Sequence, residues 1–354
     1  MDSSAPLTGR PNSMLDNLRQ KIESIQTPPE LKQNTLDMIS RLERLSGQGF
    51  FSEEYEKLSH YITWISKVPW AKRVDRPIDL TAIKATLDKN HYGMEDVKER
   101  ILEYMSVMKL RASRNLGVAR APIICLVGLV GTGKTTFAYA LSEALGRPIA
   151  RIPFGGLGSA KDLRGQSRLH LEAEPGYIVR ALCDAGVKNP IILLDEIDRV
   201  TEAARADIMG VLVELLDPSQ NNRFLDHFLD YPVDLSEVMF IATANNTGNL
   251  ATAVMDRLEP IQMPSYNDTE KTHIAQNYLF PKALEAAGMD STLITIDPAL
   301  WQQIIRPLGY DAGIRTLNRT IEGIVRKVAL IIITGQSKTV TLNADNIKSF
   351  LPKW

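Results

Sequence analysis

The sequence predicts an α/β fold in which helices cover a mostly parallel sheet, with further helical regions before and after it. Between residues 123 and 264, five short apolar runs rich in β-branched residues alternate with helical patterns, which is typical of parallel strands joined by crossover helices. Before residue 75 and after residue 265, apolar residues recur at intervals of three and four, the period of an amphipathic helix. The five strands are expected at residues 123–127, 149–154, 191–195, 238–244 and 261–264.

The composition indicates a globular, cytoplasmic protein. Of its 354 residues 44% are hydrophobic, which is enough to bury cores in two or three domains. Lys plus Arg (41) nearly balance Asp plus Glu (42), so no global field selects nucleic acid or a membrane as the main partner. The longest late apolar run, residues 328–334, is far shorter than the roughly 20 residues that span a bilayer. Cys125 and Cys183 lie in apolar or helical contexts, which favours reduced packing residues over a disulfide or zinc site.

The predicted organisation has four parts. Residues 1–13 are rich in Ser, Pro and Gly and lack an apolar stretch, which predicts a disordered tail without a signal peptide. Residues 14–75 are expected to form a helical N-terminal subdomain, and residues 76–264 the α/β domain. Residues 265–354 are expected to form a small helical domain that contains one short β-like piece, "TVTLN".

A glycine-rich segment follows the first predicted strand and precedes a helix. It satisfies the pattern G-x-x-x-x-G-K-[ST]. In this context the backbone N–H groups wrap phosphates, the helix N-terminus favours negative charge, the lysine reaches the terminal phosphates and the last hydroxyl can bind Mg²⁺. The flanking strand and helix disfavour the alternative, a structural turn that happens to end in Lys-Thr. We therefore predict an ATP and Mg²⁺ site at Gly128, Leu129, Val130, Gly131, Thr132, Gly133, Lys134, Thr135 and Thr136.

Polar residues follow two later strands of the predicted sheet. Asp195 and Glu196 come after "IILL", and Asn245 follows "FIATA". Because α/β sheets bind ligands at the carboxyl ends of their strands, we expect Asp195 to hold Mg²⁺ through water and Glu196 to polarise the attacking water. Asn245 is placed to bond the γ-phosphate or that water. Taken alone, an acidic pair after a strand is more often a helix N-terminus, and an asparagine is more often a turn residue.

Eight stretches of the sequence resemble the ATPase portion of Lon proteases, within the AAA+ superfamily, from about Met14 to Trp354. The resemblance implies an AAA+ P-loop NTPase fold. It also implies a Mg²⁺-dependent ATPase that couples hydrolysis to polypeptide remodelling or translocation, in protein quality control or ATP-dependent proteolysis. Its substrates would be unfolded or damaged proteins. The stretches are the P-loop, "YITWISKVPW", "HYGMEDVKERILEYMSVMKL", "KNPIILLDEIDRV", "LLDPSQNNRFLDHFLDYPVDLSEVMFIATAN", "MDRLEPI", "YLFPKALE" and "DAGIRTLNR".

The resemblance also implies roles for single residues. Asn245 would be the first sensor and Arg315 the second, and Arg257 would be an arginine finger that reaches a neighbouring subunit's γ-phosphate. An arginine finger supplied by a neighbouring subunit implies a ring homo-oligomer, expected to be a hexamer. Such a finger can accelerate hydrolysis by a factor of about 10³ to 10⁵. Spacing alone assigns neither arginine a role, since arginines in loops are usually surface charges. The adenine pocket would be lined by His91, Tyr92 and Gly93.

The chain departs from the family pattern at both ends and in the pore. In Lon a peptidase domain with a Ser/Lys dyad follows the small helical domain, whereas here only "LNADNIKSFLPKW" follows. The adjacent Ser337 and Lys338 are no substitute. We therefore expect no peptide cleavage by this chain alone, and a separate peptidase is a candidate partner. The start also lacks the family's usual N-terminal substrate-recognition domain, so the chain is either a stand-alone ATPase or a shortened form.

The residues expected in the central pore also differ. His170 and Leu171 stand where the family has an aromatic and an apolar residue, and Ala204 stands where relatives often have Phe or Trp. Large flat side chains bury area against any polypeptide, so their loss predicts a weaker grip. The alternative that His170 and Leu171 grip adequately stays open.

Two other functions stay open. In the first, the chain is a regulatory module whose bound nucleotide controls its oligomeric state and which threads little substrate. The altered pore residues favour this alternative. The other is a nucleic-acid-binding ATPase, because a run of basic residues could neutralise nucleic-acid phosphates and so release their counterions. The basic run lacks interleaved aromatic residues and more often marks a solvated helix face, so nucleic acid is not the expected partner. That run comprises Lys109, Arg111, Arg114 and Arg120.

Overall fold

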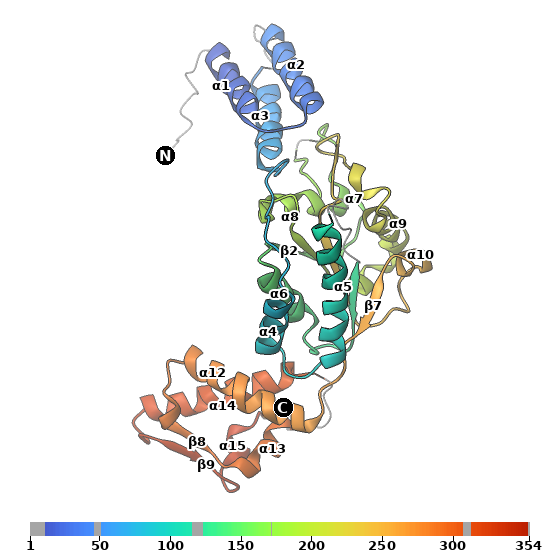
Figure 1. Ribbon diagram of the computed structural model, residues 1–354. Coiled ribbons are helices and arrows are strands. Elements are labelled where there is room, and N and C mark those ends of the chain that lie inside the picture. The colour runs from blue at the N-terminus through green and yellow to red at the C-terminus, as the bar shows by residue number, and fades with distance from the viewer. Residues whose placement is uncertain (1–10, 46–50, 115–122, 171, 307–312, 353–354) are drawn as a thin grey trace, which may run out of the picture. The chain divides into compact units, whose positions relative to one another are not determined.

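The computed structural model is drawn in Figure 1. It folds into two compact units, and each is described by itself. The structure describes residues 11–45, 51–114, 123–170, 172–306 and 313–352. The first unit is built from residues 1–79, 104–125 and 142–259, and the second from residues 80–103, 126–141 and 260–354.

A five-stranded sheet forms the centre of the α/β region. Its strand order is β2-β3-β6-β1-β7, and the β2–β3 and β3–β6 pairs are parallel. Every residue of β1, β3 and β6 is buried, as expected where helices cover both faces of a sheet. The α/β fold class is confirmed, and the strands lie within two residues of their predicted positions. They are β1 (Ile124–Val127), β2 (Ile149–Pro153), β3 (Ile191–Asp195), β6 (Met239–Ala244) and β7 (Glu259–Gln262).

Helices and short turns precede and connect these strands. They include the helix α6 that follows the predicted P-loop and the 3-10 turn η1 that follows β3. Among the described residues, no helix is both long and apolar enough to cross a membrane. The helices are α4 (Leu80–Asn90), α5 (Glu95–Ser113), α6 (Lys134–Leu145), α7 (Lys161–Arg164), α8 (Tyr177–Ala185), α9 (Arg205–Leu216) and α10 (Thr252–Met255). The 3-10 turns are η1 (Ile197–Arg199), η2 (Glu202–Ala204) and η3 (Asn221–Arg223).

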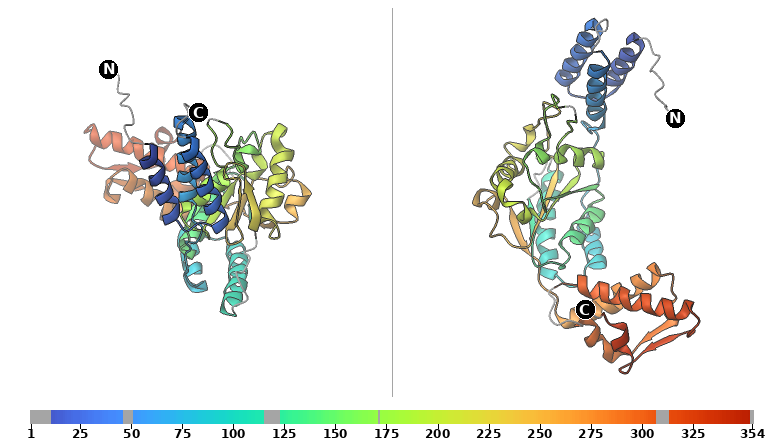
Figure 2. Two further views of the ribbon diagram at one scale, coloured as in Figure 1. Left: turned by 90° about the horizontal axis from the view of Figure 1, so that it is seen from above. Right: turned by 180° about the vertical axis from the view of Figure 1, so that it is seen from behind.

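Three N-terminal helices of the first unit pack against one another (Figure 2). Their apolar faces bury Leu15, Ile22, Leu31 and Ile39. Helix α1 begins at Pro11, inside the predicted tail, because proline fits the first turn of a helix; residues 1–10 of that tail lie outside the described residues. The helices are α1 (Pro11–Ser24), α2 (Pro29–Leu45) and α3 (Phe51–Lys67).

Helix α3 is fastened to a short hairpin of the first unit. The buried Tyr61 donates its hydroxyl to the Leu229 carbonyl over 2.9 Å. The guanidinium of Arg168 lies 4.1 Å from the centre of the Tyr61 ring, a cation–π contact. The hairpin consists of β4 (Phe224–Asp226) and β5 (Tyr231–Val233), which pair antiparallel.

The C-terminal part of the second unit is mainly helical and has its own apolar core around the buried Trp301 and Ile324. Its first helix begins with a capping box between Asn267 and Glu270. The predicted "TVTLN" piece contains strand β9 (Val340–Leu342), which pairs in parallel with β8 (Ile294–Ile296). The helices are α11 (Asp268–Ile274), the π-helical η4 (Ala275–Leu279), α12 (Phe280–Ala286), α13 (Trp301–Ile305), α14 (Arg315–Ile333) and α15 (Ile347–Phe350), with 3-10 turns η5 (Ser291–Leu293) and η6 (Pro298–Leu300).

The sequence predicts only one β-like piece in this region and misses β8, which lies within a helical pattern. A three-residue strand shows too little alternation to be separated from a helix by periodicity.

Candidate nucleotide-binding site

The predicted P-loop joins β1 to α6 within the second unit. Gly131 and Gly133 have φ of 84° and 94°, in the left-handed region that favours glycine. A Cβ on Gly128 would lie 2.8 Å from the Met263 carbonyl oxygen, so this position also excludes a side chain. The buried Thr132 closes the turn by donating its hydroxyl to the Leu129 carbonyl over 2.9 Å. The loop therefore has the bare, tightly curved backbone that can wrap a phosphate chain.

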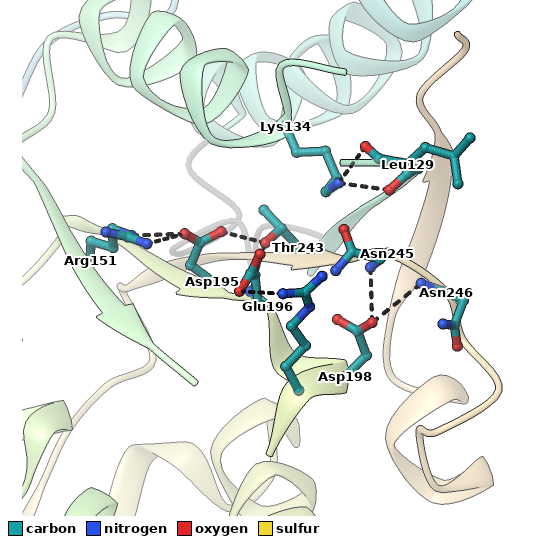
Figure 3. A network of polar contacts seen from close by, with 11 residues as sticks. Leu129, Lys134, Arg151, Asp195, Glu196, Asp198, Thr243, Asn245 and Asn246 are labelled. Atoms are coloured by element: carbon teal, nitrogen blue, oxygen red, sulfur yellow. Dashed lines mark hydrogen bonds and ion pairs between the residues drawn. The ribbon is translucent and has the colours of Figure 1, made fainter. Parts of the chain in front are cut away.

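Lys134 turns its side chain back over the loop that precedes it. Its Nζ atom donates to the carbonyl oxygens of Gly128 and Leu129, at 2.7 and 3.0 Å (Figure 3). The ammonium is therefore held at the mouth of the loop. A buried cation at this point fits a polyphosphate ligand, because phosphate oxygens are stronger acceptors than carbonyl oxygens.

The segment expected to line an adenine pocket lies beside this loop. The ring centroids of His91 and of Phe137 on α6 lie 5.0 Å apart. A Cβ on Gly133 would lie 3.5 Å from the Cε1 atom of His91. Burial lowers the pKa of His91, so the imidazole is neutral near pH 7. Within the described ranges its Nε2 atom has no hydrogen-bond partner. Tyr92 stacks on His273, with ring centroids 3.9 Å apart. The adenine-pocket role of residues 91–93 stays a prediction.

Asp195 is the centre of a polar cluster in the first unit. It is buried at the end of β3, and both of its carboxylate oxygens accept hydrogen bonds. Thr243 on β6 donates its hydroxyl to Oδ1 over 2.5 Å, and Arg151 on β2 donates Nε and Nη2 to Oδ2 over 2.8 and 2.7 Å (Figure 3). The orientation of the carboxylate is thus fixed from both neighbouring strands.

Glu196 differs from its neighbour in exposure and backbone. Its side chain is 36% exposed. Its φ of 58° is left-handed, which is unusual for a residue with a side chain and costs backbone energy. The Glu196 N–H donates to the Thr243 hydroxyl over 2.8 Å and so holds this conformation. Thr243 therefore orients the buried carboxylate of Asp195 and also holds the backbone of Glu196, whose carboxylate is accessible.

Asn245 follows β6 and is positioned through its backbone. The N–H groups of Asn245 and Asn246 donate to Oδ2 of the buried Asp198, at 3.1 and 3.4 Å (Figure 3). Asp198 belongs to the turn that follows Glu196, so it joins the ends of two neighbouring strands. The sequence reasoning missed Asp198, although it stands in the same "DEID" run as the two predicted acids.

The two predicted arginines lie in different units. Arg257, in the first unit, bonds the carboxylate of Asp217 through Nη2 over 2.8 Å and the Ala253 carbonyl through Nη1 over 2.7 Å. Hydrogen bonds from Ser219 and from Arg257 hold the pKa of Asp217 below its usual range. Arg315 opens α14 in the second unit, next to the P-loop: a Cβ on Gly131 would lie 3.4 Å from the Arg315 Cβ.

The predicted pore residues occupy different environments. His170 is exposed, and its neighbour Leu169 is 90% exposed. Ala204 is buried, so its side chain is not available to grip a substrate. Leu171 lies outside the described residues, as does Arg120 of the basic run. The other members of that run, Lys109, Arg111 and Arg114, are exposed.

Two family models match parts of this chain. Residues 124–266 match the model of the ATPase family associated with various cellular activities, AAA. The fold and the site thus define an AAA+ ATPase domain. Residues 285–340 match the Lon protease AAA+ ATPase lid domain. Over these ranges the chain is therefore similar to the AAA+ portion of Lon proteases, and the resemblance seen in the sequence is confirmed.

Individual Lon proteases are similar along almost the whole chain. It is 37% identical to Lon protease 2 of Thermus thermophilus over 344 residues, covering 95% of this chain and 42% of the relative. It is 38% identical to Lon protease of Bacillus thuringiensis over 339 residues and 40% identical to Lon protease 4 of Sorangium cellulosum over 342 residues. In both cases 96% of this chain and 42% of the relative are covered. The chain thus spans about two fifths of the length of these relatives.

Proposed function

We propose that this AAA+ ATPase domain binds ATP with Mg²⁺ and couples its hydrolysis to remodelling or translocating polypeptides. The observation that carries the proposal is the P-loop: two left-handed glycines, a third glycine with no room for a side chain, and Lys134 folded over the loop carbonyls. Bound phosphate would draw the ammonium away from these carbonyls. Lys134→Ala should therefore abolish ATP binding measured by calorimetry, and undiminished affinity would refute the assignment.

Two acids would divide the hydrolytic work. Thr135 and Asp195 would hold Mg²⁺, which neutralises charge on the phosphate oxygens. Asp195 suits this role because Arg151 and Thr243 already fix its carboxylate as an oriented acceptor. Glu196 has an accessible carboxylate and would orient the attacking water, which Asn245 would help to place. Arg315 would contact the phosphates from the start of α14.

Assembly into a ring, which we propose to be a hexamer, would complete each site. Arg257 would act on the nucleotide of a neighbouring subunit, and its ion pair with Asp217 would orient it beforehand. Arg257→Ala should spare ATP binding but remove turnover. Mixed with Glu196→Gln protein it should regain some activity, because intact Glu196 and intact Arg257 then meet at some interfaces. Absence of such rescue would count against a shared site.

Polypeptide is the proposed substrate because the relatives are named as proteases and because Leu169 and His170 present an exposed loop. Unfolded casein should raise the rate of phosphate release, whereas a folded protein of similar size should not. We also propose that the protein is cytoplasmic and that a separate peptidase acts with it. If ATP changed the oligomeric state and casein left the ATPase unchanged, the regulatory alternative would hold, which the buried Ala204 favours.

A further inference from the structure

Within the second unit, Gly313 and Ile314, which directly precede α14, lie against the backbone of the P-loop. The Ile314 N–H donates to the Gly131 carbonyl over 3.0 Å. Ile314 is the N-cap residue of α14, and Arg315 is the first residue of that helix. The start of α14 is thus bonded to the loop proposed to hold phosphate.

This approach depends on a residue without a side chain at position 313. A Cβ on Gly313 would lie 2.5 Å from the carbonyl carbon of Gly131 and 2.7 Å from its Cα and oxygen atoms. Carbon atoms in favourable contact stand about 3.5 to 4.0 Å apart. All three obstructing atoms belong to the backbone, so no side-chain rotation can make room. Any other residue at position 313 must push the two loops apart.

The carbonyl that receives this bond shapes the P-loop. The peptide group is planar, so holding the Gly131 oxygen also fixes the direction of the Thr132 N–H. That N–H points to the Leu129 carbonyl at 3.4 Å, and the Thr132 hydroxyl reaches the same oxygen at 2.9 Å. The bond from Ile314 therefore braces the turn at the middle of the loop. The same contact keeps Arg315 beside it.

We propose that Gly313 is a positioning residue of the nucleotide site, which seats the start of α14 on the P-loop so that the loop is pre-shaped for phosphate. This rests on the proposed function, since it requires that the P-loop bind nucleotide. Binding energy is then not spent on ordering the loop. It follows that nucleotide and the seated arrangement of α14 stabilise each other.

The test compares two glycines of the same region. Gly313→Ala should weaken binding of a fluorescent ATP analogue about twofold to tenfold, the value of one lost hydrogen bond. Gly323→Ala is the matched control: it lies within α14, where an added Cβ meets only the Arg326 side chain at 3.9 Å, and alanine suits a helix interior. It should bind like wild type. Equal affinity of Gly313→Ala and wild type would overturn the proposal.

Hydrogen exchange of the wild-type protein supplies a second measurement that does not depend on how the variant folds. The Ile314 amide should be protected, and ATP should increase its protection because nucleotide favours the seated arrangement. Free exchange at Ile314, or protection that ATP leaves unchanged, would overturn the proposal while wild-type binding of ATP still upheld the proposed function. If wild-type protein bound no ATP, the proposed function itself would fail, and this inference with it.

Discussion

Thr243→Val isolates the polar cluster at the end of β3, because it removes one hydroxyl and keeps the shape of the side chain. In the first unit that hydroxyl donates to Asp195 over 2.5 Å and accepts the Glu196 N–H over 2.8 Å. A hydrogen bond to a charged group contributes about 1.5 to 3 kcal/mol, and one between neutral groups about 0.5 to 1.5 kcal/mol. Since Thr243 and Asp195 are buried, water cannot readily replace either bond. We expect the free energy of unfolding to fall by about 2 to 4 kcal/mol.

The assay follows denaturation in urea and, separately, ATP binding and phosphate release. Release should fall more than binding, because the Glu196 backbone loses the bond that holds its left-handed conformation. Thr243→Ser is the control: it keeps the hydroxyl and loses one methyl group, a change of about 1 kcal/mol. If the valine and serine variants unfolded at the same urea concentration and hydrolysed ATP equally, Thr243 would not organise these acids.

Three further predictions concern single side chains. Glu196→Gln should bind ATP with unchanged affinity while phosphate release nearly stops; equal losses of both would mean that Glu196 holds the nucleotide. Hydrogen bonds from Ser219 lower the pKa of Asp217, so its charge stabilises the fold above about pH 4 and this stabilisation fades as acid protonates it. Asp217→Asn should therefore be less stable at neutral pH and lose less stability on acidification, which thermal melts at pH 7 and pH 3 would check. Burial raises the pKa of the Cys125 thiol to about 12, so iodoacetamide at pH 8 should label it only after unfolding, as mass spectrometry would show.

The parts of the site that depend on local sequence could be predicted from it. The glycine spacing of the P-loop specifies a turn that only a few residues can adopt, and the apolar runs specify the strands. Arg151 and Thr243 escaped prediction because their relation to Asp195 depends on which strands are neighbours. Once β2, β3 and β6 are known to be adjacent, the register places Arg151 opposite Leu193 and Thr243 one residue beyond the Leu194–Ala242 pair.

The contact made by Gly313 could not be predicted from the sequence for a similar reason. Its sequence context suggests an ordinary turn before a helix, and only the three-dimensional structure shows that a distant glycine, Gly131, lies against it. The ion pair between Asp217 and Arg257 could likewise not be predicted, because the two residues are 40 positions apart in the sequence. The roles of the arginines, and the domain boundaries at residues 75 and 264, stay predictions.

The stacking of Arg168 on Tyr61 has a mechanical consequence. Arg168 stands two residues before His170 in the exposed loop, and Tyr61 is bonded from within α3 to the hairpin. A force on that loop must either pull the guanidinium off the aromatic ring or shift the base of the three-helix group. The N-terminal helices are thus mechanically linked to the exposed loop that we propose contacts the substrate, and a force applied to that loop would be transmitted to them.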